Sequence, residues 1–241
     1  MRILFLSIFL IFPLLADIGT VGAHQGSASL VRQGESLTLF SGMTLQEHDA
    51  IMTKTQSKVQ LIMKDETIIT IGPSSHFEID AYSFTSDAQN NLNLRLQRGF
   101  FRTITGKIGK IAPERFKIQT KSATIGIRGT DFAAYVDQKT EYIACFSGRI
   151  EVKTSDEKFE LDTAMMVVLD KEKWRKLNLD IEKFRPLLYS NTHSSKLKNI
   201  KKDSFDTSEI ESINQQERLQ NSNFAITPGY EVPTPLPPFI P

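Results

Sequence analysis

The residues best suited to chemistry gather between Phe116 and Phe132, in the stretch FKIQTKSATIGIRGTDF. Arg128 and Asp131 lie three positions apart there, with Gly129 and Thr130 between them. Such a pair can form a binding site, or a local ion pair that fixes a corner between two strands, helped by the Thr130 hydroxyl. No nucleophile or general base lies nearby, so we favour the structural pair of Arg128 with Asp131.

The sequence predicts no metal centre. No metal-ligand spacing connects the lone Cys145 with the four histidines, which are His24, His48, His76 and His193. His76 could join Glu78 and Asp80 in a surface metal cluster, because the three residues alternate along one strand. Alternating polar residues are more typical of a solvated strand face, which is the interpretation we favour. Cys145 follows an apolar run, so we expect a buried, unreactive thiol.

The segment Thr105–Lys110 contains two glycines and two lysines, but it lacks the spacing of a phosphate-binding loop, since Ile108 follows Gly106-Lys107. A basic turn between strands is the better interpretation. No pair of carboxylates has a spacing that indicates glycoside hydrolysis. We therefore predict a non-enzymatic protein with no catalytic, cofactor-binding or metal-binding residues.

The elements that position these residues are short strands. Apolar and polar residues alternate through Leu92, Leu94 and Leu96 and again through Phe116 and Ile118, which is the period of a half-buried strand. Gly99 is expected to end one strand before Phe100 starts the next. The pattern predicts strands near residues 28–31, 36–40, 43–45, 50–53, 58–63, 67–71, 76–81, 92–97, 100–104, 116–121, 133–136, 141–146, 149–153, 159–161 and 165–169.

Close strand spacing with almost no helical periodicity predicts an all-β fold from residue 24 to residue 169. Short strands that turn at glycines favour a solenoid-like, twisted β stack. A β-sandwich is the alternative, because the sequence contains no strict repeat.

The N-terminus has the features of a secretory signal peptide. Arg2 precedes an apolar run from Ile3 to Leu15, and Val21-Gly22-Ala23 supplies small residues before His24. The run is shorter than the ~20 residues of a membrane span, so cleavage is favoured over a retained anchor. We expect residues 1–23 to be removed and the mature chain to be soluble in the bacterial periplasm.

Composition limits the partners. The chain has 241 residues, with 29 Lys and Arg against 28 Asp and Glu, for a net charge of +1. This balance does not favour nucleic acid, and neither does an export signal. A protein or glycan of the cell envelope is the expected partner.

The composition changes after Leu169. Ile181, Phe184, Leu187 and Leu188 have helical spacing, which predicts a short helical packing segment within residues 170–189. Residues 190–222 are polar and predict a weakly helical or disordered linker. Residues 223–241 are rich in proline and predict an extended tail. That tail is either a solvated end or a docking peptide anchored by Tyr230, Leu236 and Phe239.

The central stretch resembles the FecR domain, whose most recognisable segment is close to f-x-v-x-T-x-x-A-x-(I/V)-(G/A)-(I/V)-R-G-T-x-F. The likeness extends from about Gly26 to about Leu169. One departure is Asp65-Glu66-Thr67, where the family often has Asp-Gly-Ser or Asp-Gly-Thr; we expect the turn to change type and the fold to survive. The matching residues are Thr120, Ala123, Ile125, Gly126, Ile127, Arg128, Gly129, Thr130 and Phe132.

The resemblance implies a β-solenoid-like architecture and a role in envelope signalling. FecR-type regulators carry this domain in the periplasm and control a sigma factor through a cytoplasmic N-terminal region. This chain has its apolar segment at the extreme N-terminus, so the resemblance implies a stand-alone exported FecR domain that lacks the sigma-regulating region. We expect a binding or signalling module that recognises a protein or glycan. A structural or self-assembling envelope protein is the alternative.

Overall fold

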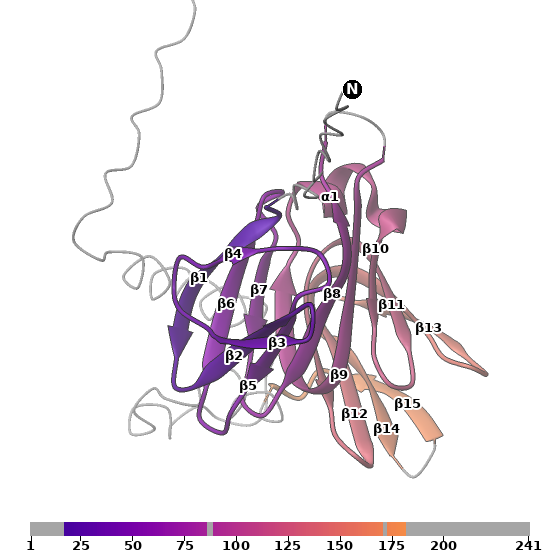
Figure 1. Ribbon diagram of the computed structural model, residues 1–241. Coiled ribbons are helices and arrows are strands. Elements are labelled where there is room, and N and C mark those ends of the chain that lie inside the picture. The colour runs from indigo at the N-terminus through magenta and orange to yellow at the C-terminus, as the bar shows by residue number, and fades with distance from the viewer. Residues whose placement is uncertain (1–16, 86–88, 171–172, 182–241) are drawn as a thin grey trace, which may run out of the picture.

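The computed structural model describes residues 17–85, 89–170 and 173–181. The described chain is almost entirely β, with one short α-helix and one turn of 3-10 helix (Figure 1). The first strands are β1 (Gly19–Gln25), β2 (Ala28–Arg32), β3 (Glu35–Thr38), β4 (Thr44–Leu45), β5 (Ala50–Thr53), β6 (Lys58–Met63), β7 (Ile68–Ile71) and β8 (His76–Ser83). The remaining elements are β9 (Asn91–Ile104), α1 (Lys107–Ile111), η1 (Pro113–Arg115), β10 (Phe116–Gln119), β11 (Thr124–Val136), β12 (Thr140–Lys153), β13 (Lys158–Asp162), β14 (Met165–Asp170) and β15 (Lys173–Asn178).

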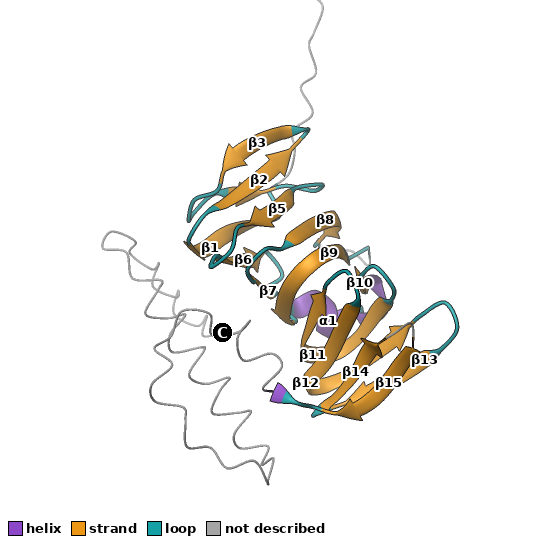
Figure 2. Ribbon diagram, turned by 90° about the horizontal axis from the view of Figure 1, so that it is seen from below, coloured by secondary structure: helices purple, strands orange, loops and turns teal. Residues whose placement is uncertain are grey.

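One continuous sheet folds over into two layers. Layer A runs β3-β2-β5-β8, then the first part of β9, β10, the first part of β11, the last part of β12, and β13. Layer B runs β4-β1-β6-β7, then the last part of β9, the last part of β11, the first part of β12, β14 and β15. Figure 2 shows the two rows of strands side by side along the length of the molecule.

Three long strands belong to both layers, and each bends at a glycine. β9, β11 and β12 contain Gly99, Gly129 and Gly148, whose φ angles are 92°, 59° and 84°. The register between β11 and β12 shifts on both sides of Asp131, at this same bend. Positive φ is accessible to glycine at little cost, so these residues allow a strand to leave one layer and enter the other.

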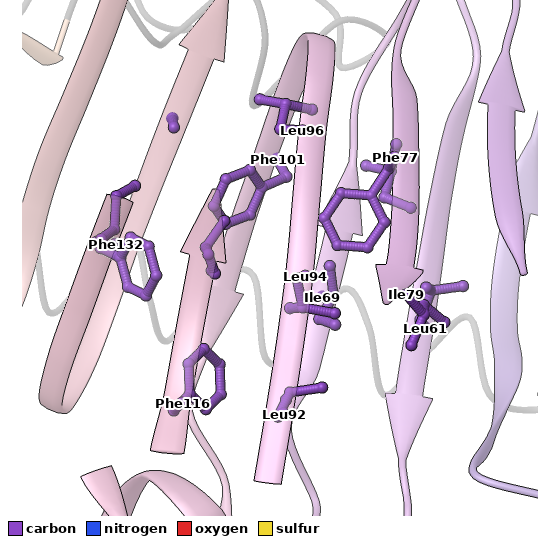
Figure 3. Close-up of a cluster of buried hydrophobic side chains, with 14 of the residues drawn as sticks. Leu61, Ile69, Phe77, Ile79, Leu92, Leu94, Leu96, Phe101, Phe116 and Phe132 are labelled. Carbon is purple, nitrogen blue, oxygen red and sulfur yellow. The ribbon is translucent and has the colours of Figure 1, made fainter. Parts of the chain in front are cut away.

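The main core fills the space between the layers. Phe77 of layer A lies 5.8 Å from Phe101 of layer B, centroid to centroid, and Phe101 meets Phe132 edge to face at 5.7 Å. Figure 3 shows these rings with leucines and isoleucines contributed by both layers. Aromatic pairs in this geometry add to the free energy already gained by burying their apolar area.

A second, smaller cluster lies on the outer face of layer B. Phe100, Phe146 and Met166 belong to it, and Leu179 and Ile181 pack against them from the end of the described chain. The Leu179 amide donates to the Ala164 carbonyl at 2.8 Å, which holds this end on the sheet.

The prediction of an all-β, twisted fold is confirmed, and most of the predicted short strands are present. Two local predictions are wrong. β9 continues through Gly99, because the glycine bends the strand without ending it. Residues 107–111 form α1, where a turn was predicted. Residues 173–178 form β15, a strand that the sequence did not predict. The helical segment predicted within 170–189 stays a prediction, because its residues 184, 187 and 188 lie outside the described residues.

The N-terminal boundary also differs from the prediction. β1 runs Gly19–Gln25 and pairs with β6 and β4, so the domain includes residues that were assigned to the signal peptide. Within the described ranges, no helix is long and apolar enough to cross a membrane.

The turn at Asp65-Glu66-Thr67 keeps the shape that a glycine would favour. Glu66 has a φ of 68°, so the residue itself adopts the left-handed conformation and the predicted change of turn type is wrong. Asp65 stabilises the turn: its side chain accepts from the Thr67 hydroxyl at 2.7 Å and from the Ile108 amide at 3.2 Å. These contacts tie the turn to α1.

Candidate functional site

A groove of about 970 Å³ lies on the outer face of layer A, over β10, β11, β12 and β13; we call it the outer groove. The hairpin at residues 120–123, the hairpin at 154–155 and the start of η1 contribute to its walls. Its lining residues are Pro113, Glu114, Lys117, Gln119, Thr120, Lys121, Ser122, Ala123, Thr124, Gly126, Ile127, Arg128, Arg149, Ile150, Glu151, Lys153, Thr154, Ser155 and Glu160.

Gly126 lies in the middle of the strand that crosses the groove. A Cβ atom at this position would meet nothing within 4 Å, and its φ does not fall in the left-handed region. Glycine weakens a strand, and neither packing nor backbone conformation requires it here. The missing side chain leaves the backbone of β11 open to a ligand.

The groove carries more positive than negative charge. Five cationic side chains line it, Lys117, Lys121, Arg128, Arg149 and Lys153, against three glutamates. Arg128 and Arg149 are direct cross-strand neighbours. Two like charges placed opposite one another destabilise a sheet, so this pair is not explained by stability of the fold.

Two charged groups of the groove, Arg149 and Glu151, are already neutralised by neighbours in the sheet. Arg149 Nε donates to Asp162 Oδ1 at 2.6 Å. Glu151 Oε2 lies 2.9 Å from Lys158 Nζ. In contrast, Lys117, Arg128 and Lys153 are exposed and form no ion pair with any described residue. Lys121, in the wall hairpin, is also exposed without an ion pair, and its charge acts on the buried Glu141. The three cations nearest the open backbone at Gly126, which are Lys117, Arg128 and Lys153, can bind an anionic group.

A buried carboxylate supports one wall of the groove. Glu141, at the start of β12, is 2 % exposed, and hydrogen bonding from Thr120 and Ser122 of the wall hairpin favours its charged form. Burial raises the pKa of Glu141, which those hydrogen bonds and the charge of Lys121 partly oppose. Its Oε1 atom has no hydrogen-bond partner among the described residues. Glu141, which belongs to the part of β12 in layer B, therefore supports the groove wall of layer A from the interior of the domain.

The predicted Arg128–Asp131 pair does not form. Arg128 faces the outer groove, whereas Asp131 lies beyond the Gly129 bend in layer B and pairs with Arg102, Nη2 to Oδ2, at 2.7 Å. The bend places the two residues on different surfaces. The Thr130 hydroxyl, expected to assist the pair, is buried without a hydrogen-bond partner in the described structure.

The other residues of the FecR-like motif divide between core and groove. Ala123, Ile125 and Ile127 are buried, which agrees with their strand parity. Phe132 is buried as well, on the far side of the Gly129 bend, where the register shifts change the alternation. The Thr120 side chain closes the wall hairpin by accepting from the Ala123 amide at 3.1 Å. The motif therefore combines a buried apolar side with the exposed positions 126 and 128.

The remaining candidates do not add a second site. His76 contacts Glu78 at 3.0 Å, and Asp80 pairs with Arg95 at 2.8 Å, so these carboxylates have partners within the sheet. No three His, Cys, Asp or Glu side chains of the described residues are grouped to hold a metal ion. Cys145 is fully buried as predicted, and burial raises the pKa of its thiol to about 12. Tyr230, Leu236 and Phe239 lie outside the described residues.

The outer groove was not predicted from the sequence, because four segments contribute to it and their register was unknown. One signal was available: Gly126 occupies an outward position of a strand and is flanked by the outward residues Thr124 and Arg128. Lys117 and Lys153 could not be placed beside Gly126 without the pairing of β10, β11 and β12.

Two crystal structures resemble the chain, both of provisionally assigned anti-sigma factors from Parabacteroides distasonis ATCC 8503. The structure at 1.65 Å shares 18% sequence identity over 56% of this chain and 61% of its own length, with a TM-score of 0.46. The structure at 2.50 Å shares 13% identity over 72% of this chain and 91% of its own, with a TM-score of 0.47. No curated protein sequence matches the chain.

The family comparison agrees with the resemblance seen in the motif. Residues 49–151 match the family model described as FecR protein. This range includes the bends of β9, β11 and β12, the buried Arg102–Asp131 pair and most of the outer groove. The chain therefore contains a FecR domain.

Proposed function

We propose that this protein is an exported, non-enzymatic signalling module of the bacterial envelope that recognises a protein partner through the outer groove. The FecR domain supports a role in signalling. The main observation in favour of a binding site in the outer groove is a group of three unpaired cations around the open backbone at Gly126. These cations are Lys117, Arg128 and Lys153. Unpaired charge on a concave surface promotes association with a complementary partner.

Export to the periplasm is part of the proposal. The apolar run from Ile3 to Leu15 supports it, because a run of that length is typical of a signal peptide. Osmotic-shock fractionation tests this step. Recovery of the processed chain in the periplasmic fraction is the expected result, and recovery of the unprocessed chain in the cytoplasm would contradict it.

Photo-crosslinking in intact cells tests the partner. A photoreactive benzoylphenylalanine replaces Thr124, which lines the outer groove, or Lys54, an exposed residue outside it. We expect a single protein adduct at position 124 and none at position 54. The adduct at position 124 should disappear when Arg128→Glu is added. An adduct that persists with Arg128→Glu, or equal adducts at both positions, would contradict recognition through the groove.

A second function, self-assembly, is favoured by one observation. β3 is an edge strand that pairs only with β2 in the described sheet, and Leu37 and Phe40 near it are 39% and 55% exposed. An unpaired edge with apolar side chains can pair with another copy. Sedimentation of the mature chain distinguishes the functions: a monomer excludes assembly, whereas oligomers abolished by Leu37→Lys would support it.

A further inference from the structure

We infer that the outer groove binds an extended, acidic segment of the partner protein, in which the acidic residues occupy every second position. This inference rests on the proposed function and assigns the chemistry of the partner at the same site. It depends on where the unpaired cations lie relative to β11.

The three unpaired cations occupy successive outward positions along β11, from strands on both of its sides. Lys153, on β12, is the cross-strand neighbour of Thr124, and Lys117, on β10, is the neighbour of Gly126. Arg128 belongs to β11 itself. The positions 124, 126 and 128 are each two residues apart on the same face of the strand. Consecutive cations are therefore separated along the strand axis by about 7 Å.

An extended polypeptide has the same repeat. Its alternate side chains point to one face and are also spaced by about 7 Å. A segment lying along β11 can therefore direct three successive carboxylates of one face toward Lys153, Lys117 and Arg128. The guanidinium of Arg128 can engage its carboxylate with two parallel hydrogen bonds, which fixes the register.

The centre of the groove has room for the backbone of such a segment. No side chain projects from Gly126, and no heavy atom would lie within 4 Å of a Cβ atom there. Glu151, the other cross-strand neighbour of Gly126, is held by Lys158 and does not neutralise Lys117. The spacing of the cations along β11 equals the spacing of alternate side chains in an extended polypeptide. This agreement favours a polypeptide over an acidic glycan, in which the distance between carboxylates is set by the sugar rings.

Peptide binding to the full mature chain tests the inference. The first probe is a peptide that strictly alternates glutamate with threonine, and the second has the same composition with its glutamates contiguous. We expect the alternating peptide to bind about tenfold more tightly, and its binding to weaken as salt rises from about 0.05 M to about 0.5 M. Equal affinity for the two peptides would overturn the inference.

Variants locate the binding on the groove. Arg128→Glu, Lys117→Glu and Gly126→Val should each weaken binding of the alternating peptide by about tenfold or more, the first two by charge and the third by filling the centre. Lys54→Glu is the matched control for charge and should leave affinity unchanged. Since Gly126→Val places a β-branched residue in an open strand position, its melting temperature should not fall. Unchanged binding in all three groove variants would overturn the inference.

The remaining outcomes separate this inference from the proposed function. If neither peptide binds but the adduct at position 124 still forms and depends on Arg128, the partner is a protein of other chemistry and only the inference fails. If an oligogalacturonate binds in a groove-dependent manner and the peptides do not, an acidic glycan replaces the peptide. If the alternating peptide binds as expected but no adduct forms in cells, the inference about chemistry stands and the proposed function fails.

Discussion

Arg102 and Asp131 form a bidentate ion pair that joins β9 to β11 beside the Gly129 bend. Arg102 Nε donates to Oδ1 at 2.8 Å and Nη2 donates to Oδ2 at 2.7 Å. The two side chains are 3% and 8% exposed, and the guanidinium lies 4.9 Å from the centroid of the Phe146 ring. Arg102 and Asp131 are 29 residues apart in sequence. Their ion pair stabilises the corner between strands that was predicted to depend on a pair of Arg128 with Asp131.

Removing one member of this pair should destabilise the fold strongly. Asp131→Ala removes the carboxylate that neutralises the buried Arg102 charge, which costs about 3–5 kcal/mol of unfolding free energy. Arg128→Ala is the matched control, because Arg128 is exposed in the outer groove, and it should change stability by less than about 0.5 kcal/mol. Urea unfolding followed by circular dichroism measures both. Similar losses in the two variants would contradict this assignment of the pair.

Two glycines of β11 should respond in opposite directions. Gly129 has a φ of 59°, so Gly129→Ala forces a left-handed alanine and should cost about 1–2 kcal/mol. Gly126 needs neither positive φ nor space, so Gly126→Ala should stabilise the strand by about 0.5–1 kcal/mol. The urea midpoints of the two variants, each compared with that of the wild type, measure both effects. A Gly126→Ala variant less stable than the wild type would indicate that Gly126 has a structural role.

Replacing Glu66 with glycine, the residue that FecR domains often have at this turn, should stabilise the protein. Glu66 has a φ of 68°, which costs roughly 1–2 kcal/mol for a residue with a Cβ atom. Glu66→Gly removes that strain and loses only an exposed contact with Lys107, so we expect a net gain of about 1 kcal/mol. Glu66→Ala is the control, because it loses the same contact and retains the strain. Equal melting temperatures for the two variants would show that the left-handed conformation is not the cause.

The sequence predicted those features that depend on residues close together in the chain. Alternation at Leu92–Leu96 and Phe116–Ile118 located buried strand faces, and a corner was expected between Arg128 and Asp131, where the chain bends at Gly129. Features that depend on strand register were missed. Arg102 could not be matched with Asp131, and Lys117 could not be placed beside Gly126, until β9, β10 and β11 were paired. β15 was missed because four of its six residues are charged or amide side chains, which hide strand periodicity.

Stability should depend on pH through Glu141. Burial raises the pKa of Glu141 above its ordinary value, so the folded state binds a proton more tightly than the unfolded state. The contribution of this group is fully present below the unfolded pKa and is lost as pH rises through the folded pKa. Glu141→Gln keeps a neutral side chain with a carbonyl acceptor for Thr120 and Ser122. The variant should therefore gain stability relative to the wild type as pH rises from about 4 to about 8.

Melting curves of the two proteins across that range measure the difference between them. Groups other than position 141 are shared, so their titration cancels in the comparison. A difference that does not vary with pH would show that Glu141 titrates alike in the folded and unfolded states.

The mature protein should begin before β1, at Asp17, rather than at His24. Ile18 and Val21 are 3% and 1% exposed in the core, and the Ile18 amide donates to the Leu45 carbonyl at 3.0 Å. Cleavage before His24 would remove both side chains, each contributing about 1.5–3 kcal/mol by burial. It would also leave β4 without its partner strand and four of the six β6 residues without their β1 partners. Cleavage after Leu14-Leu15-Ala16 leaves β1 intact and still places a small residue at the cleaved bond.

If the chain is exported as proposed, intact-mass spectrometry of the protein recovered by osmotic shock identifies its first residue directly. A chain beginning at Asp17 is the expected result. A recombinant chain beginning at His24 provides the matched comparison, and it should melt well below the chain that begins at Asp17, because β6 then has an open edge and the core loses two buried side chains. If the natural chain begins at His24 and both recombinant chains melt at the same temperature, β1 does not contribute to the stability of the folded domain.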